Sequence, residues 1–176
     1  MTTRTSYRRV GAGAFAAMAL LAAAGGGGGD DTKTVTAADY AFEDLPKSVD
    51  AGTTLTLKNA STKEIHEMVV FRIPDGEKRS VQQLVNLPES EQTAIFGEGP
   101  PAMVMIAPPG GGEMIQALGD GKLTEKGRYA VVCFIPTGAD PAAYLAAAQA
   151  PSDGPPQVAG GPPHTAQGMY GEITVK

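Results

Sequence analysis

Short β-prone segments separated by glycine and proline turns run from residue 34 to the end of this 176-residue chain. One of them, 53–59, alternates polar and apolar residues with the period of two that is typical of a half-buried strand. The chain has 23 Gly and 14 Pro, which favours short strands and many turns over long helices. About seven or eight such strands predict an all-β fold, an antiparallel Greek-key β-sandwich. The expected strands cover 34–42, 45–52, 53–59, 65–73, 102–106, 114–118, 128–135 and 170–176.

Two stretches interrupt the strand pattern and predict short helical insertions, at about 80–112 and 136–163. In the first, Ser80 and Gln83 fit a capping box at the start of a helix, and a second helix is expected near residue 88. In the second, Asp140 is an N-cap residue followed by proline and an alanine-rich run. A long loop in a compact domain is usually functional or disordered, so we expect a helical lid with a flexible return.

The N-terminus has the composition of an export leader. Arg4, Arg8 and Arg9 form a positive region before the apolar run 10–24, which ends in small residues suited to cleavage. That run is too short for a comfortable membrane span. The expected division of the chain is a signal peptide at 1–24, a glycine-rich linker at 25–33 and one β-sandwich domain at 34–176.

Export would place the chain in the periplasm, at the cell surface or outside the cell. The pair Arg8-Arg9 resembles a twin-arginine motif, although Tyr7 stands where that motif prefers Ser or Thr. A lipoprotein leader would carry a lipidated cysteine near position 24, where this chain has Ala24, so no lipid anchor to a membrane is predicted there. A net charge of −5 without a basic patch argues against nucleic-acid binding.

The chain has one cysteine, Cys133, and two histidines, His66 and His164, and all three stand beside expected strands. An unpaired thiol is a liability in an oxidising compartment, and binding a metal resolves this better than inert burial does. Met169 follows His164 by five residues. Two imidazoles, a thiolate and a thioether are the ligand set of a blue-copper electron-transfer site, since the sulfur ligands favour Cu(I) and imidazole serves both oxidation states.

Three segments resemble, in the same order, the ligand segments of the cupredoxin family. Asn59 precedes a loop that leads to His66 and an apolar strand, Tyr129 precedes Cys133 by four residues, and His164 precedes the closing strand. The similarity covers about 34–73 and 113–176. It implies a plastocyanin-like β-sandwich that binds one type 1 copper and carries single electrons to an unidentified redox partner, as a monomer. In this resemblance, His66, Cys133 and His164 are the equatorial copper ligands and Met169 is the axial ligand.

The distance between Cys133 and His164 departs from that family, which usually has only a few residues there. Thirty residues intervene in this chain, and no histidine lies at 135–138. Either His164 still returns to the site or the equatorial set is incomplete. Lengthening a loop from about 3 to about 30 residues costs roughly 2 kcal/mol, which is small beside metal-binding energies of ~10 kcal/mol or more. We therefore expect His164 to return, and expect deletion of about 138–160 to leave a foldable domain.

Two other functions stay open: a copper carrier or sequestering protein without electron transfer, and a copper-free cupredoxin-like module that uses its insertions to bind a partner. No enzymatic activity is expected, because the chain has no CxxC, nucleophile elbow or P-loop, and two histidines cannot build further copper centres. Asn59 and Ser61 either hydrogen-bond across to the Cys133 loop or form a polar turn. Four other methionines are expected to pack in the core: Met68, Met103, Met105 and Met114.

Overall fold

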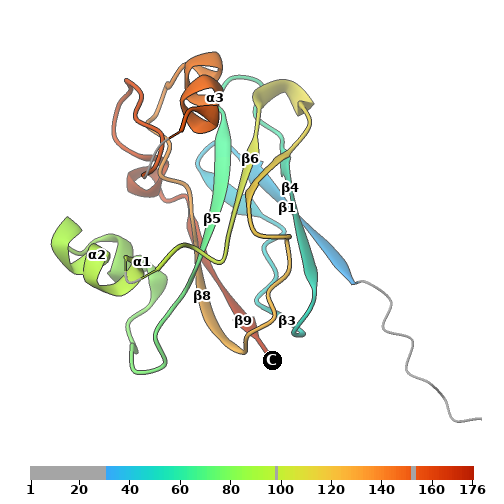
Figure 1. Cartoon of the computed structure of the whole chain (residues 1–176), viewed down its shortest axis with the longest axis vertical. Coiled ribbons are helices and arrows are strands. Elements are labelled where there is room, and N and C mark those ends of the chain that lie inside the picture. The colour runs from blue at the N-terminus through green and yellow to red at the C-terminus, as the bar shows by residue number, and fades with distance from the viewer. Residues whose placement is uncertain (1–30, 98, 152–153) are drawn as a thin grey trace, which may run out of the picture.

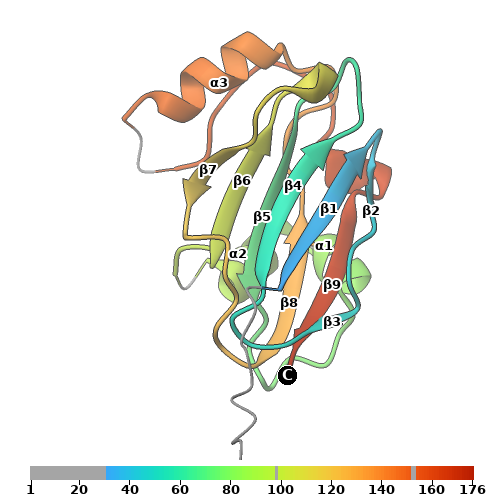
Figure 2. The same ribbon diagram turned by 90° about the vertical axis from the view of Figure 1, so that its right-hand side faces the viewer.

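The computed structural model describes residues 31–97, 99–151 and 154–176, and within them two β-sheets face each other (Figures 1 and 2). The signal peptide expected at 1–24 and most of the linker expected at 25–33 lie outside the described residues. Among the described residues, no helix has the length and apolar character needed to cross a membrane. The all-β sandwich expected from the sequence is confirmed.

The smaller sheet has three strands in the order β2-β1-β4. β1 (Thr32–Ala38) turns into β2 (Ala41–Glu43) and pairs in parallel with β4 (Thr54–Asn59). β1 begins at Thr32, two residues before the first expected strand, and Thr32 already pairs with Thr54. In β4, the leucines are buried and the threonines are partly exposed, as the alternating sequence predicts.

The larger sheet has six strands in the order β3-β9-β8-β5-β6-β7. Its neighbours pair antiparallel except for β3 and β9, which are parallel. Together with β1–β4, this gives two parallel pairs that the sequence did not predict, since alternation fixes which face a residue occupies but not the direction of its neighbour. The bounds are β3 (Ser48–Val49), β5 (His66–Arg72), β6 (Met103–Ala107), β7 (Ile115–Leu118), β8 (Gly127–Val132) and β9 (Tyr170–Val175).

The main core lies between the two sheets. Met68, Met103 and Met105 are fully buried in it, and Met114 packs against it, so these methionines are core residues as expected. A second apolar cluster lies on the outer face of β5 and β8, beneath α1 (Val81–Val85) and α2 (Glu89–Phe96). Because both faces of the central strands are covered, β5 and β8 carry nearly continuous apolar sequences.

Both insertions form the helices that their caps predict. Ser80 and Gln83 make the reciprocal capping box at α1. Asp140 caps α3 (Pro141–Gln149) by accepting a hydrogen bond of 2.7 Å from the Ala143 amide. Figure 2 shows α3 lying across the end of the sandwich at which β5 begins. Two short 3-10 turns complete the fold, η1 (Pro109–Gly111) and η2 (His164–Gln167).

Candidate metal centre

Strand pairing brings His66, Cys133 and His164 to one end of the larger sheet. His66 is the first residue of β5, and Cys133 directly follows β8, which runs antiparallel to β5. His164 opens η2, which leads into β9 beside β8. The start of β5, the end of β8 and the start of β9 therefore meet, although Cys133 and His164 are 31 positions apart.

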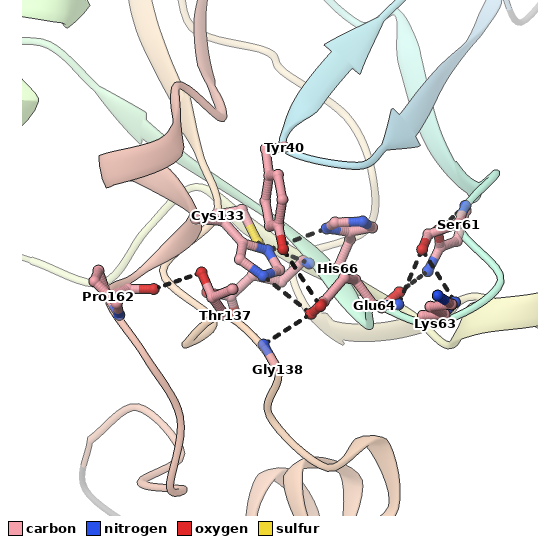
Figure 3. Close-up of polar contacts among 12 residues, drawn as sticks. Tyr40, Ser61, Lys63, Glu64, His66, Cys133, Thr137, Gly138 and Pro162 are labelled. Atoms are coloured by element: carbon pink, nitrogen blue, oxygen red, sulfur yellow. Dashed lines mark hydrogen bonds and ion pairs between the residues drawn. The ribbon is translucent and has the colours of Figure 1, made fainter.

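The donor atoms of these three residues lie close together, and Figure 3 shows His66 and Cys133 among the residues of this site. Nδ1 of His66 lies 3.2 Å from Nδ1 of His164, and Sγ of Cys133 lies 3.3 Å from Nδ1 of His164. All three donor atoms are within 4.8 Å of one another. Nitrogen and sulfur ligands about 2.0–2.3 Å from one ion, at tetrahedral or trigonal angles, stand roughly 3.3–3.8 Å apart. The spacing thus fits a single metal ion bound by all three residues.

The ends of the long insertion are pinned together, which explains how His164 returns. Thr137 N–H donates to Pro162 O over 2.9 Å, and Gly161 N–H donates to Thr137 O over 2.8 Å. Closer to the cluster, His164 N–H donates to Ile135 O and the next amide donates to Cys133 O, each over 3.0 Å. The chain therefore leaves and re-enters the site as a paired stem, and the expected return of His164 is confirmed.

Burial sets the protonation of the metal-free cluster. The side chains of His66, Cys133 and His164 are completely buried. Burial, followed by the neighbouring His164, lowers the pKa of His66 to about 4. Burial also lowers the pKa of His164, although Glu64 opposes this, and it raises the pKa of the Cys133 thiol, with the charge of Glu67 adding to the effect. At neutral pH both imidazoles are consequently neutral, the form that binds metals.

The three facing donor atoms are incompletely hydrogen-bonded by protein groups, and this observation favours a bound metal. At most one N–H···N hydrogen bond can join the two facing Nδ1 atoms, so protein groups leave these buried atoms incompletely paired. Nε2 of His66 also has no hydrogen-bond partner among the described residues, and an ion held at Nδ1 would not supply one. Buried polar atoms are normally paired, so each exception needs an explanation. A cation bound between two imidazoles and a thiolate would satisfy the three donor atoms at once.

Met169 lies next to the cluster along the backbone. Its N–H donates to His164 O over 3.0 Å, and its carbonyl accepts from Cys133 N–H over 3.3 Å. The side chain is fully buried. Gly168 has a φ of 103°, a left-handed conformation suited to glycine that turns the chain from η2 into β9. Met169 thus joins the two ligand segments, and its role as an axial ligand stays a prediction.

Glu67, which the sequence analysis did not identify, makes three hydrogen bonds beside Cys133. Its N–H points to Cys133 Sγ at 3.4 Å. Its Oε1 accepts from Phe134 N–H over 3.0 Å, and its Oε2 accepts from the Tyr144 hydroxyl over 2.6 Å. The side chain is buried, and burial raises its pKa although both hydrogen bonds oppose the rise. A charged residue inside the apolar run that starts at His66 was the sequence feature that could have pointed to it.

Glu64 lies two residues before His66 in the chain, and its carboxyl group approaches His164. Its Oε2 is 3.4 Å from His164 Nε2, without hydrogen-bond geometry, and accepts from Gly138 N–H over 3.1 Å. Its Oε1 accepts from the Tyr40 hydroxyl over 3.4 Å. The Tyr40 ring meets His164 edge-on, with centroids 5.0 Å apart. Tyr40 has a φ of 62°, a strained conformation for an aromatic residue.

Asn59 and Ser61 do not reach the Cys133 loop, so of the two alternatives they form the polar turn. The Asn59 amide donates to Glu64 O and Ala107 O, both over 2.9 Å, and accepts from Ser61 N–H. Ser61 Oγ accepts from the amides of Lys63 and Glu64. A side chain that begins a loop bonds more readily to that loop than across the site. These two residues shape the β4–β5 loop and thereby hold Glu64 in place.

Comparisons with known proteins found similarity only among solved structures. No protein-family model and no curated protein matches the chain. Among solved structures, reduced auracyanin from Roseiflexus castenholzii is similar at 20% identity and a TM-score of 0.45, over 85% of this chain and 99% of that one. Auracyanin A from Chloroflexus aurantiacus, described as a "blue" copper protein, is similar at 15% identity and a TM-score of 0.38, over 82% and 99%.

Reduced rusticyanin is similar at 17% identity and a TM-score of 0.40, over 83% of this chain and 80% of that one. The argument for a metal site in this chain comes from its own buried donor cluster. The β-sandwich and a histidine–cysteine–histidine cluster at one of its ends have the form expected from the cupredoxin resemblance.

Proposed function

We propose that this chain is an exported type 1 copper protein that carries single electrons. The observation that supports the proposal is the convergence of His66, Cys133 and His164 at one buried point. A copper ion bound there would supply a one-electron Cu(II)/Cu(I) couple, because one thiolate and two imidazoles suit both oxidation states. In this proposal Met169 is the weak axial ligand.

The protein's own contribution is to hold the donors still and to exclude water. His66 is anchored by its pairing with Ala107 of β6, Cys133 by its N–H bond to Met169 O, and His164 by its amide bond to Ile135. Donors on paired strands have little freedom to move when the charge of the site changes. Because all three side chains are buried, water does not compete for the site.

The electrons would pass to and from a redox partner whose identity the chain does not reveal, with no catalytic reaction of its own. We further propose that the leader-like residues 1–24 direct export and are then removed. Determining the N-terminal sequence of the protein from the cell fractions tests this. A chain that begins near residue 25 outside the cytoplasm would support export, and an intact chain confined to the cytoplasm would contradict it.

Voltammetry of the copper-loaded protein tests electron transfer. We expect a reversible one-electron wave from one copper per chain. Copper binding with slow or irreversible cycling would instead indicate a copper carrier or sequestering protein. A chain that takes up no copper would indicate a copper-free binding module.

A further inference from the structure

The helix within the long insertion makes a buried hydrogen bond to the metal end of the sandwich. The hydroxyl of Tyr144, on α3, donates to Glu67 Oε2 over 2.6 Å. Tyr144 is 2% exposed and Glu67 is 5% exposed, so water does not compete for this bond. The two residues are 77 positions apart in the sequence. The bond therefore joins the insertion to the strand that carries His66.

Glu67 passes this attachment on to Cys133. Its second oxygen accepts from Phe134 N–H over 3.0 Å, and this amide belongs to the peptide group that follows Cys133. Its own N–H lies 3.4 Å from Cys133 Sγ. Glu67 therefore fixes both the sulfur atom and the peptide beyond it, while Tyr144 fixes the orientation of the Glu67 carboxyl group.

The position of Tyr144 is itself fixed by the start of its helix. Asp140 caps α3 through its side chain, and its carbonyl accepts from Tyr144 N–H over 3.0 Å. Tyr144 and Ala139 belong to the main core, and Leu145 and Ala148 pack against it. The hydroxyl thus reaches Glu67 from a helix that is packed and capped, so α3 is no loose cover over the site.

We propose that Tyr144 is a positioning residue for the metal centre, holding Cys133 in place through Glu67. On this basis the insertion between Cys133 and His164 holds the site in position as well as covering it. The inference rests on the proposed copper-binding function for its consequence, but the mechanical link from Tyr144 to the Cys133 loop exists without a metal.

Tyr144→Phe removes the hydroxyl and leaves the ring in place. Outer partners of metal ligands typically contribute about 10–100-fold to metal affinity, so we expect the Cu(I) affinity to fall by about tenfold. Glu67→Leu should lower it further, because both acceptor oxygens are lost. Glu67→Gln should lower it least, since the amide oxygen can still accept from Phe134 N–H and the amide nitrogen can donate to the Tyr144 oxygen.

Tyr129→Phe is the matched control. Tyr129 is also 2% exposed, and its hydroxyl donates to Glu125 O over 2.8 Å at the opposite end of the sandwich. Both substitutions thus remove one tyrosine hydroxyl and one hydrogen bond. Only the substitution at Tyr144 should change copper affinity.

The test uses the full chain and two measurements. Hydrogen exchange of the Phe134 amide, followed by NMR in the metal-free protein, reports the link itself. Competition with a Cu(I) chelator reports the affinity. We expect Tyr144→Phe to speed exchange at Phe134 by about tenfold, with little change at the Ile73 amide, which bonds to Arg128 O at the far end. Tyr129→Phe should leave Phe134 protected.

The proposal is overturned if Tyr144→Phe leaves both Phe134 exchange and Cu(I) affinity within twofold of the unsubstituted chain. It is equally overturned if exchange rises by the same factor at Phe134 and Ile73, since the tyrosine would then contribute only to general stability. An unsubstituted chain that takes up no copper would contradict the proposed function, whereas a selective change at Phe134 would still support the link to Cys133.

Discussion

At the end of the sandwich that holds His66, the carboxyl group of Glu67 is buried and hydrogen-bonded, whereas at the opposite end the carboxyl groups beside Arg72 form ion pairs in contact with water. Glu67 is 5% exposed and receives hydrogen bonds from Phe134 and Tyr144. At the far end, Arg72 pairs with Asp75 at 2.9 Å and with Glu125 at 3.5 Å, and these two acidic side chains are 81% and 75% exposed.

This difference predicts where a polar substitution will change stability most. Exposed ion pairs contribute little, because water solvates the separated charges nearly as well as the partner does. A buried carboxyl group that loses its donor keeps its full desolvation penalty. The far end also has an open cavity of about 550 Å³ beside Arg72, so its side chains have water on one side. The metal end should therefore respond strongly to single substitutions and the far end weakly.

The largest expected effect follows from Cys133→Ser. The thiolate is the donor of the expected charge-transfer band, and a hydroxyl group is a poor ligand for Cu(I), so the band should vanish and Cu(I) affinity should fall by at least about a hundredfold. Visible spectroscopy and chelator competition measure both. A retained band would exclude Cys133 as a ligand.

His164→Ala should come next. Removing an imidazole should lower Cu(II) affinity by more than the roughly 10–100-fold that outer partners contribute. Asp75→Asn at the far end is the control and should leave the affinity unchanged. Equal affinities in the two variants would mean that the second imidazole is not a ligand.

Deletion of residues 138–160 should itself lower the stability of the protein. The sequence led us to expect a foldable remainder, but the deletion would remove Tyr144 and Ala139 from the main core. It would also leave the Glu67 carboxyl group without its hydroxyl donor. We now expect a marked loss of stability, measurable by urea unfolding of the metal-free protein. A deletion variant as stable as the intact chain would show that α3 is dispensable.

On acidification, the two ends of the sandwich should lose their contributions to stability in different pH ranges. His66 has a pKa of about 4 when folded and about 6.5 when unfolded, so between these values the unfolded chain binds more protons and stability falls as the pH falls. The loss from this one group is roughly 3 kcal/mol. At the far end, Arg79 lowers the pKa of Glu77 to about 2, so its contribution is lost only as the pH falls from about 4.5 towards 2.

Urea unfolding of the metal-free protein at pH 7, 5.5 and 4 measures this difference. We expect most of the decrease above pH 4, where the histidines titrate. His66→Gln should flatten the curve in that range, because it removes the titrating group. A flat curve for the unsubstituted chain between pH 7 and 4 would contradict the burial of neutral histidines.

Met169→Leu should change copper binding less than the substitutions of Cys133 and His164. Leucine fills a similar volume without a sulfur donor, so copper should stay bound, with an affinity within about tenfold of the original. The reduction potential should rise, since the axial ligand tunes it. Voltammetry measures the change. An unchanged potential would remove Met169 from the site.

Asp75→Asn should have the smallest effect. The side chain is 81% exposed, and its pair with Arg72 joins residues three positions apart. Stability should change by no more than about 0.5 kcal/mol, and by less in high salt. Urea unfolding at two salt concentrations tests this. A loss several times larger would mean that the far end is as tightly coupled as the metal end.

Local features of the fold could be predicted from the sequence. The alternation in β4 and the caps at Ser80 and Asp140 depend on neighbouring residues, and each element formed where these features placed it. The candidate ligands were also predictable, because the chain has a single cysteine and only two histidines. The structure brings all three together.

Contacts between distant segments could not be predicted. The parallel pairing of β1 with β4 depends on the whole topology, which a local pattern does not contain. The bond from Tyr144 to Glu67 spans 77 positions, and an alanine-rich helix gave no reason to single out its tyrosine. For Asn59 and Ser61 the sequence left a bond across the site and a polar turn as alternatives, and the structure shows the turn within their own loop.

The visible spectrum of the full chain during titration with Cu(II) tests the central claim most directly. The buried cluster of His66, Cys133 and His164 predicts an intense thiolate-to-Cu(II) band that grows until one copper is bound per chain and then stops. A chain that binds no copper, or that binds it without an intense band, would contradict a type 1 copper site.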